Sequence, residues 1–162
     1  MHMESKVSSS LTIQQAGAKS FEAAYRLLDR FFLEEGFNAP AQQTRASLWT
    51  MVSGPGSAVF LAHRDQQAVG VATVTTSVGL EYGRSAELGD LYVLPEERGS
   101  GVASALIEAV CTWCSEQQVS VVLVTVTPEG EGEHGLTDFY RRRGFAATGR
   151  VILERALYLP GS

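Results

Sequence analysis

The sequence predicts a mixed α/β domain, with a mostly antiparallel central sheet and helices on both of its faces. Two segments of helical periodicity precede the central strands, and three β-branched segments follow at hairpin spacing. A long amphipathic segment then joins two strands in a parallel crossover. The 162 residues, 44% of them hydrophobic and 19% charged, suit one globular domain. We expect a flexible lead over 1–10 and one domain over 11–160.

The first part of the chain predicts one strand and two helices. Residues 11–14 alternate between apolar and polar side chains, which favours a first strand. Apolar residues recur at helical spacing over 20–35, and Gly36 is expected to end that helix. Pro40 can open a second helix, which the turn residues 53–56 close.

The middle of the chain predicts the sheet and its crossover helix. Residues 57–63, 68–77 and 87–93 are rich in β-branched and apolar side chains, and a short polar break after the first favours a hairpin. A helix is expected from 102 to 117. The following segment, 120–126, is almost wholly apolar, as in a strand covered on both faces.

The last part predicts a loop, a short helix and a closing strand. Residues 128–135 are dominated by Pro, Gly and Glu and are expected to form a loop. A short helix is expected over 136–143. Residues 151–159 (VILERALYL) are mostly apolar and are expected to close the sheet.

The charge balance favours a cationic or neutral partner. Thirteen Lys and Arg against eighteen Asp and Glu give a net charge of −5, so a nucleic-acid surface, which needs many cations, is disfavoured. The sequence holds no apolar run of about 18 residues, the length that a membrane span needs. We expect a cytoplasmic protein that binds neither nucleic acid nor membrane.

No metal site is expected. Cys111 and Cys114 have CxxC spacing, but they fall late in a predicted helix, where the helix dipole raises a thiol pKa. The three histidines are scattered, and no second Cys or His pair completes a metal site.

The most informative stretch is a glycine loop between the strand ending at Val93 and the helix starting at Val102. Such a strand, loop and helix start leave several backbone N–H groups unpaired and aimed at one point, where an anion can accept them. Gly99 and Gly101 let the backbone approach that anion, and Arg98 adds charge nearby. Classical nucleotide motifs do not fit, because there is no GxxxxGK[ST] and the loop does not follow the first strand.

Two ordered motifs give a family resemblance. The run Arg98-Gly99-Ser100-Gly101-Val102-Ala103 resembles the [Q/R]-x-x-G-x-[G/A] signature of the GNAT superfamily of N-acetyltransferases. The run 139–145 (FYRRRGF) resembles the second hallmark of that family, FYxxxGF. The order of predicted elements is similar over nearly all of residues 11–159. Within the family, the chain looks most like small aminoglycoside and polyamine acetyltransferases.

The resemblance implies acetyl-CoA as cofactor, with coenzyme A as product. The amides of the glycine loop would hold the pyrophosphate, and the backbone of the preceding strand would meet the pantetheine arm and thioester. The sheet would splay between the strands containing Glu87 and Ser120. The cofactor-binding residues implied are Leu91, Tyr92, Val93, Arg98, Gly99, Ser100, Gly101, Val102 and Ala103. The sequence departs from the family pattern at Glu133 and Leu136, where many members carry Asn and Ala.

Acetyl transfer to an amine needs a group that removes a proton. An alkyl amine has a pKa of about 10, so at pH 7 the neutral form costs about 4 kcal/mol. Glu87 and Asp90 are the carboxylates of the strand beside the expected thioester, and simple alternation places them on opposite faces. By resemblance, Glu87 is favoured for proton removal, directly or through a water, and Asp90 for amine binding. Capping of a loop or pairing with Arg84 is the alternative for both.

Tyr140 is the expected acid. The resemblance places its hydroxyl near the thioester sulfur, and a phenol of pKa about 10 can protonate a leaving thiolate. The alternative is an aromatic core residue beside Phe139.

Acceptor choice is expected to come from the early helices and the loops that border the cleft. Carboxylates among aromatic side chains suit a small polycation, most simply an aminoglycoside antibiotic, which implies a role in antibiotic resistance. Polyamine or peptide N-terminal acetylation and a catalytically silent acyl-CoA sensor are the alternatives, and a homodimer is possible by analogy. The candidate acceptor residues are Glu34, Glu35, Phe37, Trp49, Glu81 and Tyr82.

Overall fold

The structure, a computed structural model, describes residues 10–157, so all but the last residue of the expected lead lies outside the described residues. Contacts divide the chain after Thr125 into two compact units. Between residues 10 and 157, no helix has both the length and the apolar character that crossing a bilayer requires.

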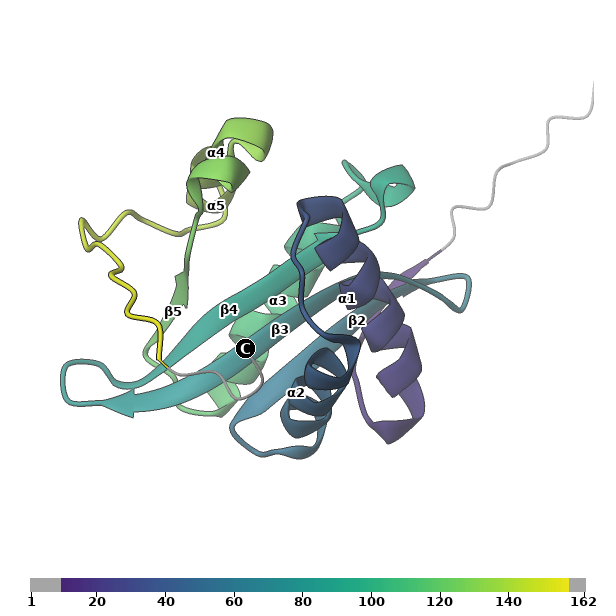
Figure 1. The fold of residues 1–162 in the computed structure, drawn as a ribbon, viewed down its shortest axis with the longest axis horizontal. Helices are drawn as coiled ribbons and strands as arrows, with labels where there is room; N and C mark the ends of the chain where they lie inside the picture. Colours follow the sequence, from purple (N-terminus) through teal and green to yellow (C-terminus); the bar gives the residue numbers. More distant parts are fainter. Residues whose placement is uncertain (1–9, 158–162) are drawn as a thin grey trace, which may run out of the picture. The chain divides into compact units, whose positions relative to one another are not determined.

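The first unit is built on a five-stranded sheet in the order β1-β2-β3-β4-β5 (Figure 1). The first three pairings are antiparallel, and β4 and β5 pair in parallel. This confirms the predicted mostly antiparallel sheet with one parallel crossover. The strands are β1 (Leu11–Gln15), β2 (Ser57–Arg64), β3 (Gln67–Gly79), β4 (Gly83–Val93) and β5 (Val121–Val124).

Helices cover both faces of this sheet. Figure 1 shows α1 (Phe21–Glu35) and α2 (Ala41–Ser53) on one face and α3 (Val102–Glu116) on the other. Two short 3-10 turns, η1 (Ala18–Ser20) and η2 (Pro95–Glu97), precede α1 and α3. Gly36 ends α1 at φ 72°, a left-handed conformation that glycine adopts without a Cβ penalty.

Close packing fixes the start of α3 on the sheet. A Cβ built on Gly70 of β3 would lie 3.0 Å from Val102 Cγ1 and 3.0 Å from Leu106 Cδ1. Leu106 and Ile107 are buried against the central strands. The absence of a side chain at Gly70 therefore lets the first turns of α3 approach the sheet, which also positions the loop before them.

A β-bulge at Gly89 sets the faces of β4. Thr75 pairs with Glu87 and Thr73 pairs with Asp90, so three steps along β4 match two along β3. Directly paired residues of an antiparallel ladder share a face, and residues two apart in a strand do so too. Glu87 and Asp90 therefore lie on the same face, and the prediction of opposite faces was wrong because the extra residue shifts the alternation by one.

The pairing of β4 with β5 ends early. Its last pair joins Leu88 to Val124, whereas β4 runs on to Val93. The expected strand 120–126 is shorter than predicted, and β5 is half-buried and not covered on both faces. The reason is its position at the edge of the described sheet. The segment 89–93 of β4 has β3 on one side and no β5 partner on the other.

The second unit contains two short helices, α4 (Pro128–His134) and α5 (Leu136–Arg141). The prediction of a loop over 128–135 was wrong, because local capping outweighs the Gly and Glu content. The Thr127 hydroxyl accepts a hydrogen bond from the Gly130 N–H at 3.0 Å, and Pro128 stands at the helix start, where its missing N–H costs nothing. Gly135 separates the two helices at φ 57°.

The end of the described chain is not a strand. Residues 151–157 form no strand, so the prediction over 151–159 was wrong for these residues, and 158 and 159 lie outside the described range. Val151, Ile152 and Leu153 are exposed. A strand needs a hydrogen-bonded neighbour, and within residues 10–157 this segment has none.

Candidate functional site

The glycine loop forms as expected between η2 and α3. Gly99 has φ 77° and Gly101, the residue before α3, has φ 88°. A Cβ at either position would meet no atom within 4 Å, so the backbone angle and not crowding favours glycine there. The Ser100 hydroxyl donates to Glu97 O at 2.5 Å and adds a local closure.

The loop presents unpaired backbone donors. Among residues 10–157, no group accepts a hydrogen bond from the backbone N–H groups of 99–103, and no side chain caps α3. These donors stand at the positive end of a 15-residue helix dipole. Such an arrangement is suited to a phosphate or pyrophosphate.

The Arg98 side chain is held by residues of β4 and α1. Its Nε donates to Val93 O at 3.0 Å, and its Nη2 lies 3.3 Å from Glu34 Oε2 at the end of α1. Its guanidinium also stands over the ring of Tyr92, 5.7 Å from the centroid. The positive charge that the sequence places at the loop is therefore already partnered by a carboxylate.

Asp90 is held by a buried threonine on the neighbouring strand. The Thr73 hydroxyl, on a side chain only 1% exposed, donates to Asp90 Oδ2 at 2.6 Å. It also accepts from the Asp90 N–H at 3.0 Å. Burial raises the pKa of Asp90 and the hydrogen bond from Thr73 lowers it, with a net rise. A carboxylate with a raised pKa is a better proton acceptor than an ordinary one.

Glu87 differs from Asp90 in being exposed. It makes no hydrogen bond or ion pair with the described residues. Arg84, the expected alternative partner, donates instead to Gln117 O at 3.4 Å. The two carboxylates therefore share a face but not an environment, since one is half-buried and bonded and the other is open.

The expected thioester contacts, Leu91, Tyr92 and Val93, lie on the part of β4 that has no β5 partner. The hydroxyl of Tyr92 donates to Glu34 Oε1 at 2.6 Å. Burial and this hydrogen bond raise the pKa of Tyr92 to about 12. The Tyr92 side chain is therefore bonded to another residue of the protein, whereas its backbone lies on the part of β4 that has no β5 partner.

Tyr140 lies in α5 of the second unit and is 7% exposed. Its ring packs edge-on against Phe139 and Phe145, with centroids 5.0 and 5.3 Å away. Burial raises its pKa to about 12. The hydroxyl makes no hydrogen bond with the described residues, and its oxygen is not sealed from solvent. A phenol of this kind remains protonated at neutral pH.

The expected acceptor residues lie at three places in the first unit. Glu34 and Glu35 end α1, and Phe37, 55% exposed, follows them and packs on Phe31 and Phe32. Trp49, 50% exposed, packs edge-on against Phe21. Glu81 and Tyr82 lie in the hairpin between β3 and β4. Both carboxylate oxygens of Glu34 have partners within the unit, Tyr92 at Oε1 and Arg98 at Oε2.

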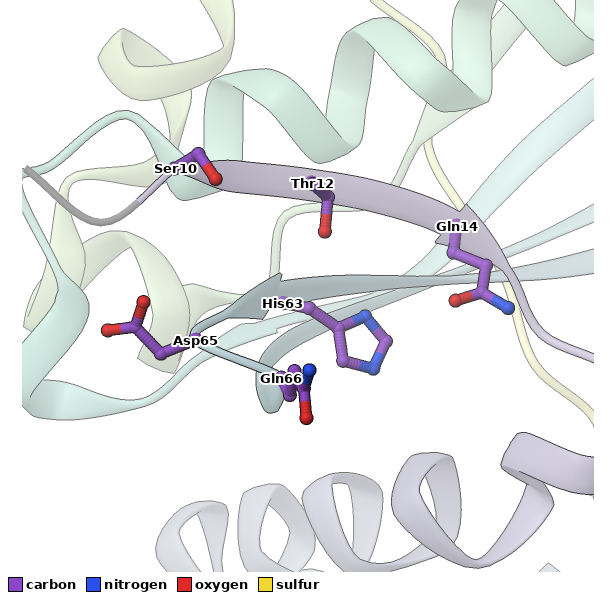
Figure 2. A pocket seen from close by; sticks show the side chains of 6 residues that line it. All are labelled: Ser10, Thr12, Gln14, His63, Asp65 and Gln66. Carbon is purple, nitrogen blue, oxygen red and sulfur yellow. The ribbon is translucent and has the colours of Figure 1, made fainter.

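One hollow of the described surface lies away from these residues, against β1 and β2. It has a volume of about 530 Å³ and is open. Figure 2 shows Thr12, Gln14 and His63 pointing to the same side of the two strands, with Asp65 and Gln66 at the following turn. None of its lining residues is a candidate from the sequence.

The two cysteines are free thiols in α3. Burial raises the pKa of Cys114 to about 11, so its reactive thiolate form is suppressed.

Two features of the site were missed at the sequence level. Gly89, a lone glycine inside a strand, is a known signal for a bulge and could have indicated the shared face of Glu87 and Asp90. Thr73 had no such signal, because only the register of β3 against β4 brings it to Asp90.

Solved structures show the same fold. An integron cassette protein, HFX_CASS3, from the mobile metagenome of Cole Harbour Salt Marsh is 27% identical, with a TM-score of 0.78 over 91% of both chains. The aminoglycoside N-acetyltransferase AAC(6')-Iy, solved with CoA, is 24% identical, with a TM-score of 0.80 over 91% of this chain and 95% of that one. A ribosomal-protein-alanine N-acetyltransferase from Brucella melitensis biovar Abortus 2308 is 18% identical, with a TM-score of 0.72 over 91% and 99%.

A search of curated proteins found no match to the chain. The model of the acetyltransferase (GNAT) family matches residues 21–145, which include β2 to β5, the glycine loop and Tyr140. The family uses acetyl-CoA as acetyl donor. The chain therefore belongs to the acetyltransferase (GNAT) family and is an acetyl-CoA-dependent N-acetyltransferase.

Proposed function

We propose that this enzyme acetylates a primary amine of a small cationic acceptor, with aminoglycosides as the first class to test, by direct attack in a ternary complex. The observation that carries the proposal is the bulge at Gly89. It brings Asp90, on the part of β4 without a β5 partner, to the same face as Glu87, which still pairs with Leu123 of β5. Two carboxylates on one face can bind an acceptor that carries more than one ammonium group.

The glycine loop is proposed to bind the diphosphate of acetyl-CoA through the amides of 99–103. They are the open donors at the start of α3. Each hydrogen bond to a charged group is worth about 1.5 to 3 kcal/mol, so several amides suffice without the Arg98 guanidinium. The open part of β4, including Leu91 and Val93, is proposed to meet the pantetheine arm through its backbone groups.

Acetyl-CoA supplies the acetyl group as a thioester, and its transfer to nitrogen releases the CoA thiol. The resemblance favours Glu87 for proton removal, but we assign this step to Asp90, which Thr73 holds and whose raised pKa suits it. Asp90 takes a proton from the acceptor ammonium, and the neutral amine then attacks the thioester carbon. Glu87, exposed on the same face, holds a second positive charge of the acceptor. Tyr140, protonated because its pKa is about 12, donates a proton to the departing sulfur. The second proton that the nitrogen loses as the amide forms restores the phenol, and Asp90 returns its proton to solvent.

The test measures thiol release with acetyl-CoA over a panel of aminoglycosides, polyamines, amino acids and peptides. We expect turnover with polycationic amines, and a loss of at least about tenfold in kcat/KM in Asp90→Asn. Glu87→Gln is expected to raise KM more than it lowers kcat. Turnover with neutral peptides alone would overturn the proposed acceptor class, and polyamine turnover without aminoglycoside turnover would move it to the polyamines.

Calorimetry with CoA tests the donor half separately. Exothermic binding at one site is expected. If CoA does not bind the folded protein, the proposed role of the loop amides is wrong.

A further inference from the structure

We propose that Glu34 is a positioning residue that connects the end of α1 to the cofactor loop. The inference rests on the proposed binding of CoA by that loop. Glu34 was a candidate acceptor ligand, but both of its oxygens are engaged inside the first unit. Tyr92 Oη donates to Oε1 at 2.6 Å, and Arg98 Nη2 lies 3.3 Å from Oε2.

The contacts of Glu34 connect α1 to two parts of the chain that lie 58 and 64 residues further along, the end of β4 and the glycine loop. Tyr92 lies on the open part of β4, two residues after Asp90. Arg98 precedes Gly99 and the α3 start, and its Nε also holds Val93 O at 3.0 Å. Arg30 Nε, one turn earlier in α1, lies 3.5 Å from Glu34 Oε1. One carboxylate thus joins α1, β4 and the glycine loop.

The charges of this cluster explain why the loop stays open. A guanidinium free at the loop could lie over the amides of 99–103 and obstruct them. Here it is fixed against Val93 O, the Tyr92 ring and the Glu34 carboxylate. The hydrogen bond from Tyr92, and then the Arg98 contact, hold the pKa of Glu34 below its ordinary value, although burial opposes them. The carboxylate is therefore charged throughout the neutral range.

The same cluster reaches the acceptor side. Gly36 and Phe37 directly follow α1 and open the connection to α2. Phe31, on α1, packs on Tyr92 with ring centroids 5.4 Å apart, and Phe37 packs on Phe31 at 6.2 Å. A change in the position of Arg98 is therefore transmitted through Glu34 and Tyr92 to the residues before α2. Glu34 thus positions both the proposed CoA-binding loop and Phe37, one of the expected acceptor residues.

The experiment compares CoA binding by calorimetry in the wild type, Glu34→Gln, Arg98→Gln and the double variant. Glu34→Gln is expected to weaken CoA binding about fivefold, the size of a partly exposed, hydrogen-bonded ion pair. The double variant is expected to bind no more weakly than the weaker single variant, because both changes remove one interaction. If the losses of CoA binding free energy in the two single variants add up in the double variant, the proposal is overturned. Additive losses are expected if Glu34 only stabilises α1 and does not act through Arg98.

The matched control is Glu22→Gln. Glu22 is also an α1 carboxylate paired with an arginine, Arg45, but that pair joins α1 to α2 and not to the loop. The control is expected to retain the wild-type affinity for CoA. An equal loss in the control would overturn the proposal.

A second variant covers the case in which Glu34→Gln does not fold. Tyr92→Phe removes only the phenol oxygen that donates to Glu34, and it is expected to weaken CoA binding about twofold to threefold. Unchanged affinity in all folded variants would overturn the role of Glu34 while CoA binding by the wild type upholds the proposed function. Absence of CoA binding in the wild type would instead refute the function on which the inference rests.

Discussion

The Thr73 hydroxyl forms two hydrogen bonds with one residue, donating to Asp90 Oδ2 at 2.6 Å and accepting from the Asp90 N–H at 3.0 Å. A single buried side chain thus fixes both the carboxylate and the backbone of the bulged strand. Gly89 contributes to this geometry, because a Cβ there would stand 3.1 Å from Thr73 Oγ1. The position of the proposed base is therefore determined by a strand that does not contain it.

Thr73→Val keeps the shape of the side chain and removes its oxygen. The hydroxyl lowers the pKa of Asp90, so its loss is expected to raise that pKa further and to move the acid limb of kcat/KM to higher pH. The partly buried N–H of Asp90 also loses its acceptor, at a cost of about 1 to 3 kcal/mol in the free energy of unfolding. A pH–rate profile and chemical denaturation measure the two effects.

The control for this change is Thr76→Val. It removes the hydrogen bond from the Thr76 hydroxyl to Gly56 O, 2.8 Å long, from the same strand. We expect lower stability with an unmoved acid limb. An acid limb unchanged in Thr73→Val would exclude Asp90 as the titrating base.

Asp90 also makes stability depend on pH in an unusual direction. Its pKa is raised above 3.8 in the folded protein, so the folded state keeps the proton to higher pH than the unfolded chain does. The contribution of this group to stability is present below pH 3.8 and is lost as pH rises through the folded pKa. Asp90→Asn is expected to remove that loss. The denaturation midpoint of Asp90→Asn relative to the wild type should therefore rise as the pH is raised from acid to neutral. A difference that stays constant with pH would contradict this account.

Gly101→Ala tests the backbone of the cofactor loop. At φ 88° an alanine is strained by about 1 to 2 kcal/mol, although no atom obstructs its Cβ. The loop is expected to relax and the affinity for CoA to fall about tenfold, as measured by calorimetry. Gly17→Ala is the control, because Gly17 has φ −129° and equally open surroundings. Wild-type affinity in Gly101→Ala would show that the loop amides do not bind CoA.

Tyr140→Phe tests the proposed acid. Turnover is expected to fall at least about tenfold with little change in CoA affinity, because the phenol acts on the leaving group and not on the diphosphate. Tyr25→Phe on α1 is the control. Steady-state assays with the best acceptor of the panel compare the turnover of the wild type, Tyr140→Phe and Tyr25→Phe. Unchanged turnover in Tyr140→Phe would remove Tyr140 from the mechanism.

Gly70→Ala tests the contact between β3 and α3. The new methyl group would lie 3.0 Å from Val102 and Leu106 atoms and 3.3 Å from Tyr92 O, so overpacking is expected to cost about 1 to 3 kcal/mol of unfolding free energy. Gly56→Ala is the control, since its nearest atom is Thr76 Oγ1 at an ordinary 3.7 Å. Denaturant midpoints compare them, and equal stabilities would contradict the close approach of α3.

Local sequence patterns predicted most elements because most of them are determined locally. The helical repeat of α1 ends at Gly36, and α3 begins directly after Gly101. The local patterns gave wrong predictions where strand pairing or helix capping determines the secondary structure. Thr127 and Pro128 start a helix inside a Gly- and Glu-rich segment, and 151–157 has apolar residues but no paired strand.

The candidate site follows the same division. The glycine loop was recognisable because its two glycines adjoin a helix start, and the structure gives both a positive φ. The shared face of Glu87 and Asp90 depends on register, which one sequence does not determine. The pairing of Glu34 with Tyr92 joins residues 58 positions apart, so no local pattern indicates it.

Because the β4–β5 ladder ends early, the two edges of the β4 backbone over 89–93 have different hydrogen-bonding environments. Over 89–93, one edge of the backbone is anchored to β3, while the other has no strand partner. Peptide groups alternate in direction along a strand, so amide protons on the anchored edge should exchange slowly and those on the free edge fast. A molecule bound along the free edge would slow the exchange of the amide protons on that edge alone. Amide exchange in 89–93 would then detect binding even if the strand does not change its conformation.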